Sequence, residues 1–169
     1  MAAKENANKE LKTLIVYYSK TGNTHTIATY IHDLTSGDMV ELIPVDSYPG
    51  DYTATTQQAK RELESGYRPP LTTKIDAIGT YDLVFVGSPN WWSTVAGPVK
   101  TFLTSYDLSG KILAPFITHE GSGLAQIVTD IEKWCPKSAV TKGLAIRGHK
   151  VVSAQGDVAA WLRSIGLSQ

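Results

Sequence analysis

The feature of this sequence that most restricts its fold is a set of five short, almost continuously apolar runs spaced along the chain. These runs cover residues 13–18, 39–43, 82–87, 111–117 and 144–146. Most of them lack the alternation of apolar and polar residues that is typical of a strand with one face in water. We therefore predict five strands that are covered on both faces, as in a parallel sheet.

Segments with the spacing of amphipathic helices lie between and after these runs. They cover residues 23–35, 53–65, 95–105, 124–134 and 158–165, and Gly156 or Asp157 is expected to cap the last of them. Five alternations of strand and helix predict a three-layer α/β sandwich with right-handed crossovers. We expect one domain over residues 11–169, preceded by a disordered tail over residues 1–10.

The composition excludes several classes of function. Sixteen basic residues balance sixteen acidic ones, whereas a general nucleic-acid binder needs a basic surface. The single cysteine excludes an intramolecular disulfide, and four scattered histidines form no metal-binding pattern. No apolar run approaches the roughly 18 residues that span a bilayer, and the polar N-terminus lacks a signal-peptide core. We expect a cytoplasmic protein that binds neither nucleic acid nor membrane.

In such a sheet, ligands bind beyond the carboxyl ends of the strands. The loop after the first strand consists of Ser19, Lys20, Thr21, Gly22, Asn23 and Thr24. Its hydroxyls, its glycine and the helix N-terminus that follows predict a cradle for a phosphate, and its low charge suits a phosphomonoester. The loop lacks the pattern of nucleoside triphosphatases. The alternative is an ordinary strand–helix turn with good capping residues.

The loop predicted after the third strand, residues 88–93, contains two adjacent tryptophans. The residues of interest are Pro89, Asn90, Trp91 and Trp92. Adjacent side chains point in different directions, so we expect at least one ring near the surface, where a flat aromatic ligand can stack. The alternative is that both rings only cover neighbouring elements.

The loop after the fourth strand is polar and rich in glycine. It contains His119, Glu120, Gly121, Ser122 and Gly123. Its backbone N–H groups are suited to carbonyl or phosphate oxygens, although a flexible turn before a helix explains the loop equally well. Together, the three loops indicate a ligand with one phosphate and a planar heterocycle, and FMN has this structure.

Three segments of the sequence resemble the flavodoxins, in particular a bacterial branch with a Trp-Trp pair after the third strand. They read LIVYYSKTGNT, YDLVFVGSPNWW and TFLTSYDLSGKILAPFITHEGSG. The resemblance covers residues 11–166. It implies a five-stranded parallel sheet of order 2-1-3-4-5, non-covalently bound FMN, and electron transfer with redox partner proteins, a reductase as donor and an unidentified acceptor. By position, residues 19–24 hold the phosphate, residues 90–92 flank the isoalloxazine, and residues 119–123 line its far side.

The sequence departs from this family in three respects. Ser93 stands where a glycine often follows the Trp-Trp pair, the net charge is zero instead of acidic, and no tyrosine after the fourth strand covers the second flavin face. Three functions therefore stay open: an electron carrier, an NAD(P)H-dependent FMN or quinone reductase, and a flavin-free binding module on the same fold. No catalytic side chain is predicted, because the flavin performs the redox chemistry.

Overall fold

The computed structural model describes residues 10–167. Apart from Glu10, the tail predicted over residues 1–10 lies outside the described residues. All five predicted strands are present, as β1 (Thr13–Tyr17), β2 (Asp38–Glu41), β3 (Leu83–Trp91), β5 (Ile112–His119) and β7 (Leu144–Arg147). Two more strands of two residues each are β4 (Thr94–Val95) and β6 (Ala139–Val140).

The strands form one sheet of the order β2-β1-β3-β5, with β6 and β7 both paired to β5. All pairs are parallel except β3–β4. The five predicted strands therefore have the order 2-1-3-4-5, as expected. Along this edge, Leu113 pairs with Val140 and Phe116 with Leu144, so two residues of β5 face three of the neighbouring segment. The extra residue interrupts the pairing, so two short strands, β6 and β7, lie beside β5 in place of one continuous strand.

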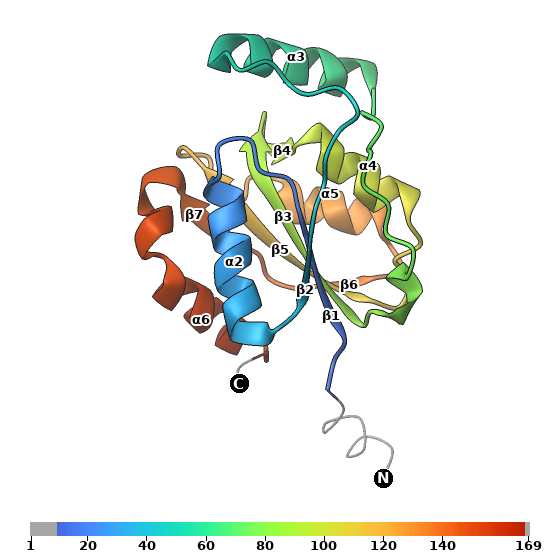
Figure 1. Ribbon diagram of the computed structural model, residues 1–169, viewed down its shortest axis with the longest axis vertical. Coiled ribbons are helices and arrows are strands. Elements are labelled where there is room, and N and C mark those ends of the chain that lie inside the picture. Colours follow the sequence, from blue (N-terminus) through green and yellow to red (C-terminus); the bar gives the residue numbers. More distant parts are fainter. Residues whose placement is uncertain (1–9, 168–169) are drawn as a thin grey trace.

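Helices cover both faces of the sheet. They are α2 (Asn23–Thr35), α3 (Tyr52–Ser65), α4 (Gly97–Ser105), α5 (Ile127–Trp134) and α6 (Gln155–Ser164), with short 3₁₀ helices η1 (Ile78–Thr80) and η2 (Gly148–Ser153). Helices α2 and α6 lie on one face and α4 and α5 on the other, whereas α3 lies beyond the carboxyl ends of the strands (Figure 1). This is the predicted three-layer sandwich, with one helix outside its layers.

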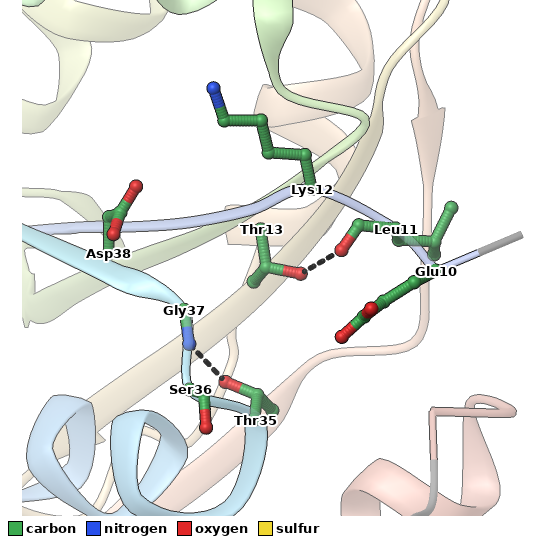
Figure 2. A pocket seen from close by; sticks show the side chains of 8 residues that line it. All are labelled: Glu10, Leu11, Lys12, Thr13, Thr35, Ser36, Gly37 and Asp38. Atoms are coloured by element: carbon green, nitrogen blue, oxygen red, sulfur yellow. Dashed lines mark hydrogen bonds between the residues drawn. The ribbon is translucent and has the colours of Figure 1, made fainter.

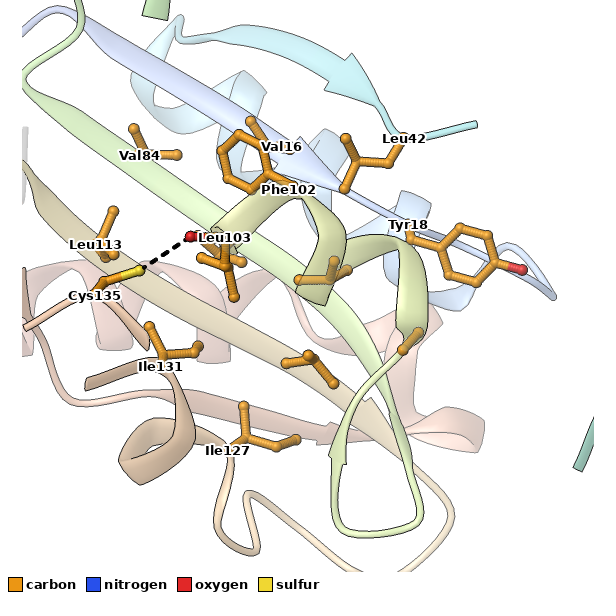
Figure 3. Packing of buried hydrophobic residues seen from close by; sticks show 14 of the residues in the cluster. Val16, Tyr18, Leu42, Val84, Phe102, Leu103, Leu113, Ile127, Ile131 and Cys135 are labelled. Carbon is orange, nitrogen blue, oxygen red and sulfur yellow. Dashed lines mark hydrogen bonds between the residues drawn. The ribbon is translucent and has the colours of Figure 1, made fainter. Parts of the chain in front are cut away.

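The two faces of the sheet carry separate apolar clusters. Along β1, Leu14 and Val16 belong to the cluster under α4 and α5, whereas Ile15 belongs to the cluster under α2 and α6. Figure 3 shows the first cluster, in which Phe102 of α4 and Ile131 of α5 pack on the central strands. Complete burial of side chains of this size stabilises a fold by roughly 1.5–3 kcal/mol each.

Three predicted helix starts are wrong. Helix α4 begins at Gly97 and not at residue 95, because Thr94 and Val95 form β4. Helix α6 begins at Gln155 after Ala154 and not at a cap formed by Gly156 or Asp157. The reason is that η2 runs directly into it, so Ala154 accepts a hydrogen bond from the N–H of Val158. Helix α5 begins at Ile127 because residues 124–126 form a turn, in which Ala125 has a φ of 45°.

Candidate functional site

The loop between β1 and α2 is organised by one hydroxyl. Ser19 Oγ accepts hydrogen bonds from the backbone N–H groups of Gly22, at 3.1 Å, and His25, at 3.2 Å. Gly22 has a φ of 99°, which favours glycine, and no atom lies within 4 Å of a Cβ placed on it. The loop is therefore a tight turn with open space beside its glycine.

The start of α2 has backbone N–H groups that no acceptor among the described residues binds. Among residues 10–167, the N–H groups of Asn23 and Thr24 have no hydrogen-bond acceptor. A helix N-terminus carries a partial positive charge in addition to such N–H groups. The hydroxyl of Ser19, which accepts both of its bonds, still has its own proton to donate. This loop therefore has the donor set that an anion such as a phosphate requires.

The segment with the two tryptophans is a β-hairpin, and the loop predicted over residues 88–93 is wrong for most of its length. Strand β3 continues to Trp91 and pairs with β4, with Asn90 opposite Val95 and Trp91 opposite Thr94. Trp92 and Ser93 form the two-residue turn, with φ values of 55° and 69°. Positive φ at both positions is the geometry of a type I′ turn, whose twist matches the flanking strands.

The two tryptophans point to different surroundings, as their adjacency predicts. Trp91 is half-buried, with its ring edge-on to Tyr18 at 5.5 Å and to Tyr48 at 4.9 Å. Trp92 is 46% exposed, and its indole N–H donates to the carbonyl of Thr56 in α3 at 2.9 Å. Lys60 of α3 lies over the same ring, with 5.4 Å from Nζ to the ring centre. Trp91 is thus held in place by Tyr18 and Tyr48, and Trp92 connects the hairpin to α3.

The loop after β5 begins with a histidine that binds its own backbone. His119 Nδ1 accepts a hydrogen bond from the N–H of Gly121 at 2.9 Å, so the neutral ring carries its proton on Nε2. Burial lowers the pKa of His119, the charge of Arg147 lowers it further, and Glu120 offsets part of this effect. The neutral ring, which this bond requires, is therefore the favoured form near neutral pH.

Direct hydrogen bonds join the three loops at the carboxyl edge of the sheet. The buried hydroxyls of Thr24 and Thr118 lie 2.8 Å apart, which ties the first loop to the end of β5. The side-chain amide of Asn90 donates to the carbonyl of Gly123 at 2.9 Å, which ties the hairpin to the third loop. The structure therefore brings all three predicted segments together at the predicted edge.

Some predicted site residues contribute no such link. Within the described part of the chain, the side chains of Lys20, Thr21 and Ser122 make no hydrogen bond. Glu120 is exposed and Pro89 is half-buried. These five residues line the loops without holding them together.

Four residues at this edge were not among the predicted site residues. Tyr18 and Tyr48 pack on Trp91. Arg147, the last residue of β7, and Gly148 directly after it contact the third loop. The rule that the residues directly after each strand deserve inspection would have found Arg147 and Gly148, since the predicted strand ended at residue 146. Tyr48 lies in a long connection whose position the sequence pattern does not reveal.

A separate concavity of the described residues lies at the opposite edge of the sheet. It is a pocket of about 340 Å³ lined by the start of β1 and by the turn from α2 into β2. In Figure 2 the polar groups of this pocket bind each other, for example Thr13 with the carbonyl of Leu11. Two of its charged side chains are already bound, since Lys12 donates to Thr80 and Asp38 accepts from Tyr81. The joined loops, and not this pocket, have the chemistry of a ligand site.

Residues 10–167 contain no group of three or more His, Cys, Asp or Glu side chains that could hold a metal ion. None of the helices formed by these residues has the length and apolar character needed to cross a membrane.

Comparison with known proteins gives consistent matches. The family model described as flavodoxin matches residues 12–165. A candidate flavoprotein from Bacteroides eggerthii is 29% identical, with a TM-score of 0.81 over 92% of this chain and 98% of that chain. A flavoprotein from Lactobacillus acidophilus, crystallised in complex with FMN, is 28% identical, with a TM-score of 0.67 over 86% of this chain and 99% of that chain.

Proposed function

The chain belongs to the flavodoxin family, and on this premise we propose that it binds FMN non-covalently and carries electrons between redox partner proteins. The observation that carries the proposal is the joining of three loops at one sheet edge by the Thr24–Thr118 and Asn90–Gly123 hydrogen bonds. The Lactobacillus acidophilus relative, whose structure contains FMN, supports the choice of cofactor. FMN supplies the one- and two-electron redox chemistry when it is bound.

In this proposal, residues 19–24 hold the phosphate. The free N–H groups of Asn23 and Thr24 and the Ser19 hydroxyl donate to phosphate oxygens, while the helix N-terminus stabilises their charge. Lys20 is the only cation within the loop. A cradle that works mainly through hydrogen bonds suits a monophosphate and gives little affinity to a triphosphate, which requires more positive charge.

The hairpin and the third loop hold the ring system. Trp91 is held edge-on by two tyrosines, so an aromatic ligand meets a ring whose orientation is already fixed. The exposed indole of Trp92 extends the wall toward α3. Gly121 and Gly123, with φ values of 149° and 63°, let the backbone of the opposite loop approach the ligand closely. None of these residues needs to act as an acid, a base or a nucleophile.

The first experiment tests cofactor binding. Purified protein is stripped of flavin and titrated with FMN and with riboflavin, and flavin fluorescence reports binding. We expect FMN to bind at least about tenfold more tightly than riboflavin, because charge-assisted hydrogen bonds to a phosphate contribute about 1.5–3 kcal/mol each. A protein that takes up neither flavin is a flavin-free module, which contradicts the proposal.

Tryptophan variants test the ring site. Trp91→Phe and Trp92→Phe are expected to weaken FMN binding by about three- to tenfold, because a phenyl ring offers less area for stacking than an indole and complete loss of stacking costs roughly 1–3 kcal/mol. Trp134→Phe on α5, whose ring lies beside Lys100 and away from the loops, is the matched control. If all three variants bind FMN like the parent protein, the hairpin is not part of the flavin site.

A second candidate function, an NAD(P)H-dependent FMN or quinone reductase, is favoured by the zero net charge, which differs from the acidity of electron-carrying flavodoxins. Two measurements distinguish the functions. A carrier is expected to show two separate one-electron steps in an anaerobic reductive titration and no turnover with NAD(P)H and a quinone. Rapid NAD(P)H consumption with a quinone acceptor would establish the reductase instead.

A further inference from the structure

A fourth segment reaches the carboxyl edge of the sheet beside the three predicted loops. Strand β7 pairs with the end of β5, so Arg147 lies opposite His119 in the parallel register. Gly148 follows at once and begins η2. In Figure 1, β7 lies next to β5 and ends at the same edge as the loops. This segment has no role in the flavin site as described above.

The side chain of Arg147 lies against the backbone of the third loop. Its Nη2 donates a hydrogen bond to the carbonyl of Glu120 at 3.1 Å, and the same nitrogen lies 3.2 Å from the position of a Cβ on Gly121. Gly121 has a φ of 149°, so it is a point where the loop backbone has unusual freedom. Arg147 therefore holds the third loop beside Gly121, the point at which the loop backbone has the most conformational freedom.

Gly148 lies between the third loop and the first. A Cβ on Gly148 would overlap the carboxylate of Glu120 and would lie 2.9 Å from the side-chain nitrogen of Asn23. Both neighbouring groups are the ends of side chains, and they can lie this close to the backbone because Gly148 has no side chain. Segments that follow β1, β5 and β7 thus meet at this glycine.

We propose, on the basis of the proposed function, that Arg147 and Gly148 form a fourth part of the FMN site. Arg147 is a positioning residue that holds residues 119–123 in their flavin-contacting conformation, and Gly148 lets this loop close against the first loop. Arg147 acts through the loop and not through the phosphate charge, since its hydrogen bond goes to a backbone carbonyl. Its contribution therefore extends to a flavin that has no phosphate.

The test compares Arg147→Gln with Lys150→Gln. Both positions are exposed and lie in the same segment, and each change removes one positive charge, but in the described structure only Arg147 binds the third loop. Arg147→Gln is expected to weaken FMN and riboflavin alike, by about five- to tenfold, and to shift the flavin reduction potential. Lys150→Gln is expected to leave riboflavin binding unchanged. Arg147→Lys recovers part of the affinity, because an ammonium group can still donate to the Glu120 carbonyl.

Two further measurements support this test: the first uses a variant at a second position, and the second needs no flavin. Gly148→Ala is expected to weaken both flavins while the melting temperature stays nearly constant, because only two flexible side-chain ends must move. In the flavin-free protein, Arg147→Gln is expected to speed hydrogen exchange at the Gly121 amide, and Lys150→Gln is not. Faster exchange with lower affinity for both flavins supports the proposal.

Two results would overturn it, and a third would refute the proposed function on which it rests. If Arg147→Gln weakens FMN but not riboflavin, Arg147 is a counter-charge for the phosphate and not a positioning residue. If Arg147→Gln and Lys150→Gln behave identically in binding and exchange, the contact with Glu120 has no role. A parent protein that binds neither flavin refutes the proposed function itself, whereas the exchange result at Gly121 still decides whether Arg147 holds the loop.

Discussion

The body of the molecule, which consists of the sheet and the helices α2, α4, α5 and α6 on its faces, is held together by other interactions than those that attach helix α3. In the body, side chains such as Phe85 and Phe116 are completely buried. In α3, the buried residues are only Thr55 and Ala59. The helix is attached instead by hydrogen bonds, one from Tyr48 to Glu62 at 2.6 Å and one from Trp92 to the Thr56 carbonyl at 2.9 Å. Burial stabilises the body globally, whereas α3 depends on a few local contacts that can open separately.

The candidate site lies where these two regions meet. The hairpin belongs to the body through the β3–β4 pairing, yet its turn residue Trp92 binds α3. A change in the body should therefore alter the stability of the whole protein, and a change in the attachments of α3 should alter only that helix. Four predictions test this distinction.

The largest effect is expected for Phe116→Ala in β5. The phenyl ring is completely buried, and removal of such a side chain costs about 3–5 kcal/mol in free energy of unfolding. Urea denaturation is expected to show one cooperative transition at a lower midpoint, with α3 lost in the same step. A loss below about 1 kcal/mol would mean that the body is not closely packed around this ring.

Gly87→Ala should have the next largest effect. Gly87 pairs with Phe116 in the sheet, and a Cβ on Gly87 would overlap the phenyl ring of that residue. Overpacking of this kind costs about 1–3 kcal/mol, measured as free energy of unfolding in urea. Adding Phe116→Leu should restore part of the loss, because it makes room for the new methyl group. Destabilisation that the second change does not relieve would place the strain elsewhere.

Tyr48→Phe is expected to act locally. Burial and the hydrogen bond to Glu62 raise the pKa of Tyr48, so the hydroxyl remains a donor throughout the neutral range. Its removal should speed amide hydrogen exchange in α3 by about two- to tenfold, which corresponds to a hydrogen bond of about 0.5–1.5 kcal/mol, and leave exchange in β3 unchanged. Tyr30→Phe is the control, since that hydroxyl binds the Val152 carbonyl within the body. Equal acceleration in β3 would show that α3 and the body open together.

The smallest effect is expected for Ser93→Gly at the hairpin turn. Ser93 has a φ of 69°, and glycine at such a position of a type I′ turn is expected to stabilise the protein by about 0.5–1 kcal/mol. Thermal unfolding should therefore show a slightly higher melting temperature. Ser105→Gly at the end of α4, where the backbone is helical, is expected to lower it. Destabilisation by both changes would exclude strain at the turn.

The strength of the local pattern decided which parts of the fold could be predicted from the sequence. Buried parallel strands leave continuous apolar runs, and α2 matches its predicted residues 23–35 at both ends because its apolar residues recur at helical intervals. The β3–β4 hairpin escaped prediction because Trp92-Ser93 is not one of the residue pairs that mark such turns.

At the candidate site, predictions succeeded where chemistry is concentrated within one loop. Residues 19–24 and 119–123 combine glycines with polar side chains and follow strands directly. The Thr24–Thr118 and Asn90–Gly123 contacts depend on the strand order and the register, which no single segment reveals. The role of Tyr48 depends on the path of a long connection, and local periodicity contains no information about that path.

The single cysteine supplies a measure of unfolding that needs no engineering. Cys135 is 7% exposed, its Sγ lies 3.6 Å from the Leu103 carbonyl, and burial raises the pKa of its thiol. Because the thiolate is the reactive form, an aromatic disulfide reagent should modify native protein slowly and unfolded protein fast. Since Cys135 packs in the cluster under α4 and α5, its modification rate reports the opening of that layer and is insensitive to the detachment of α3.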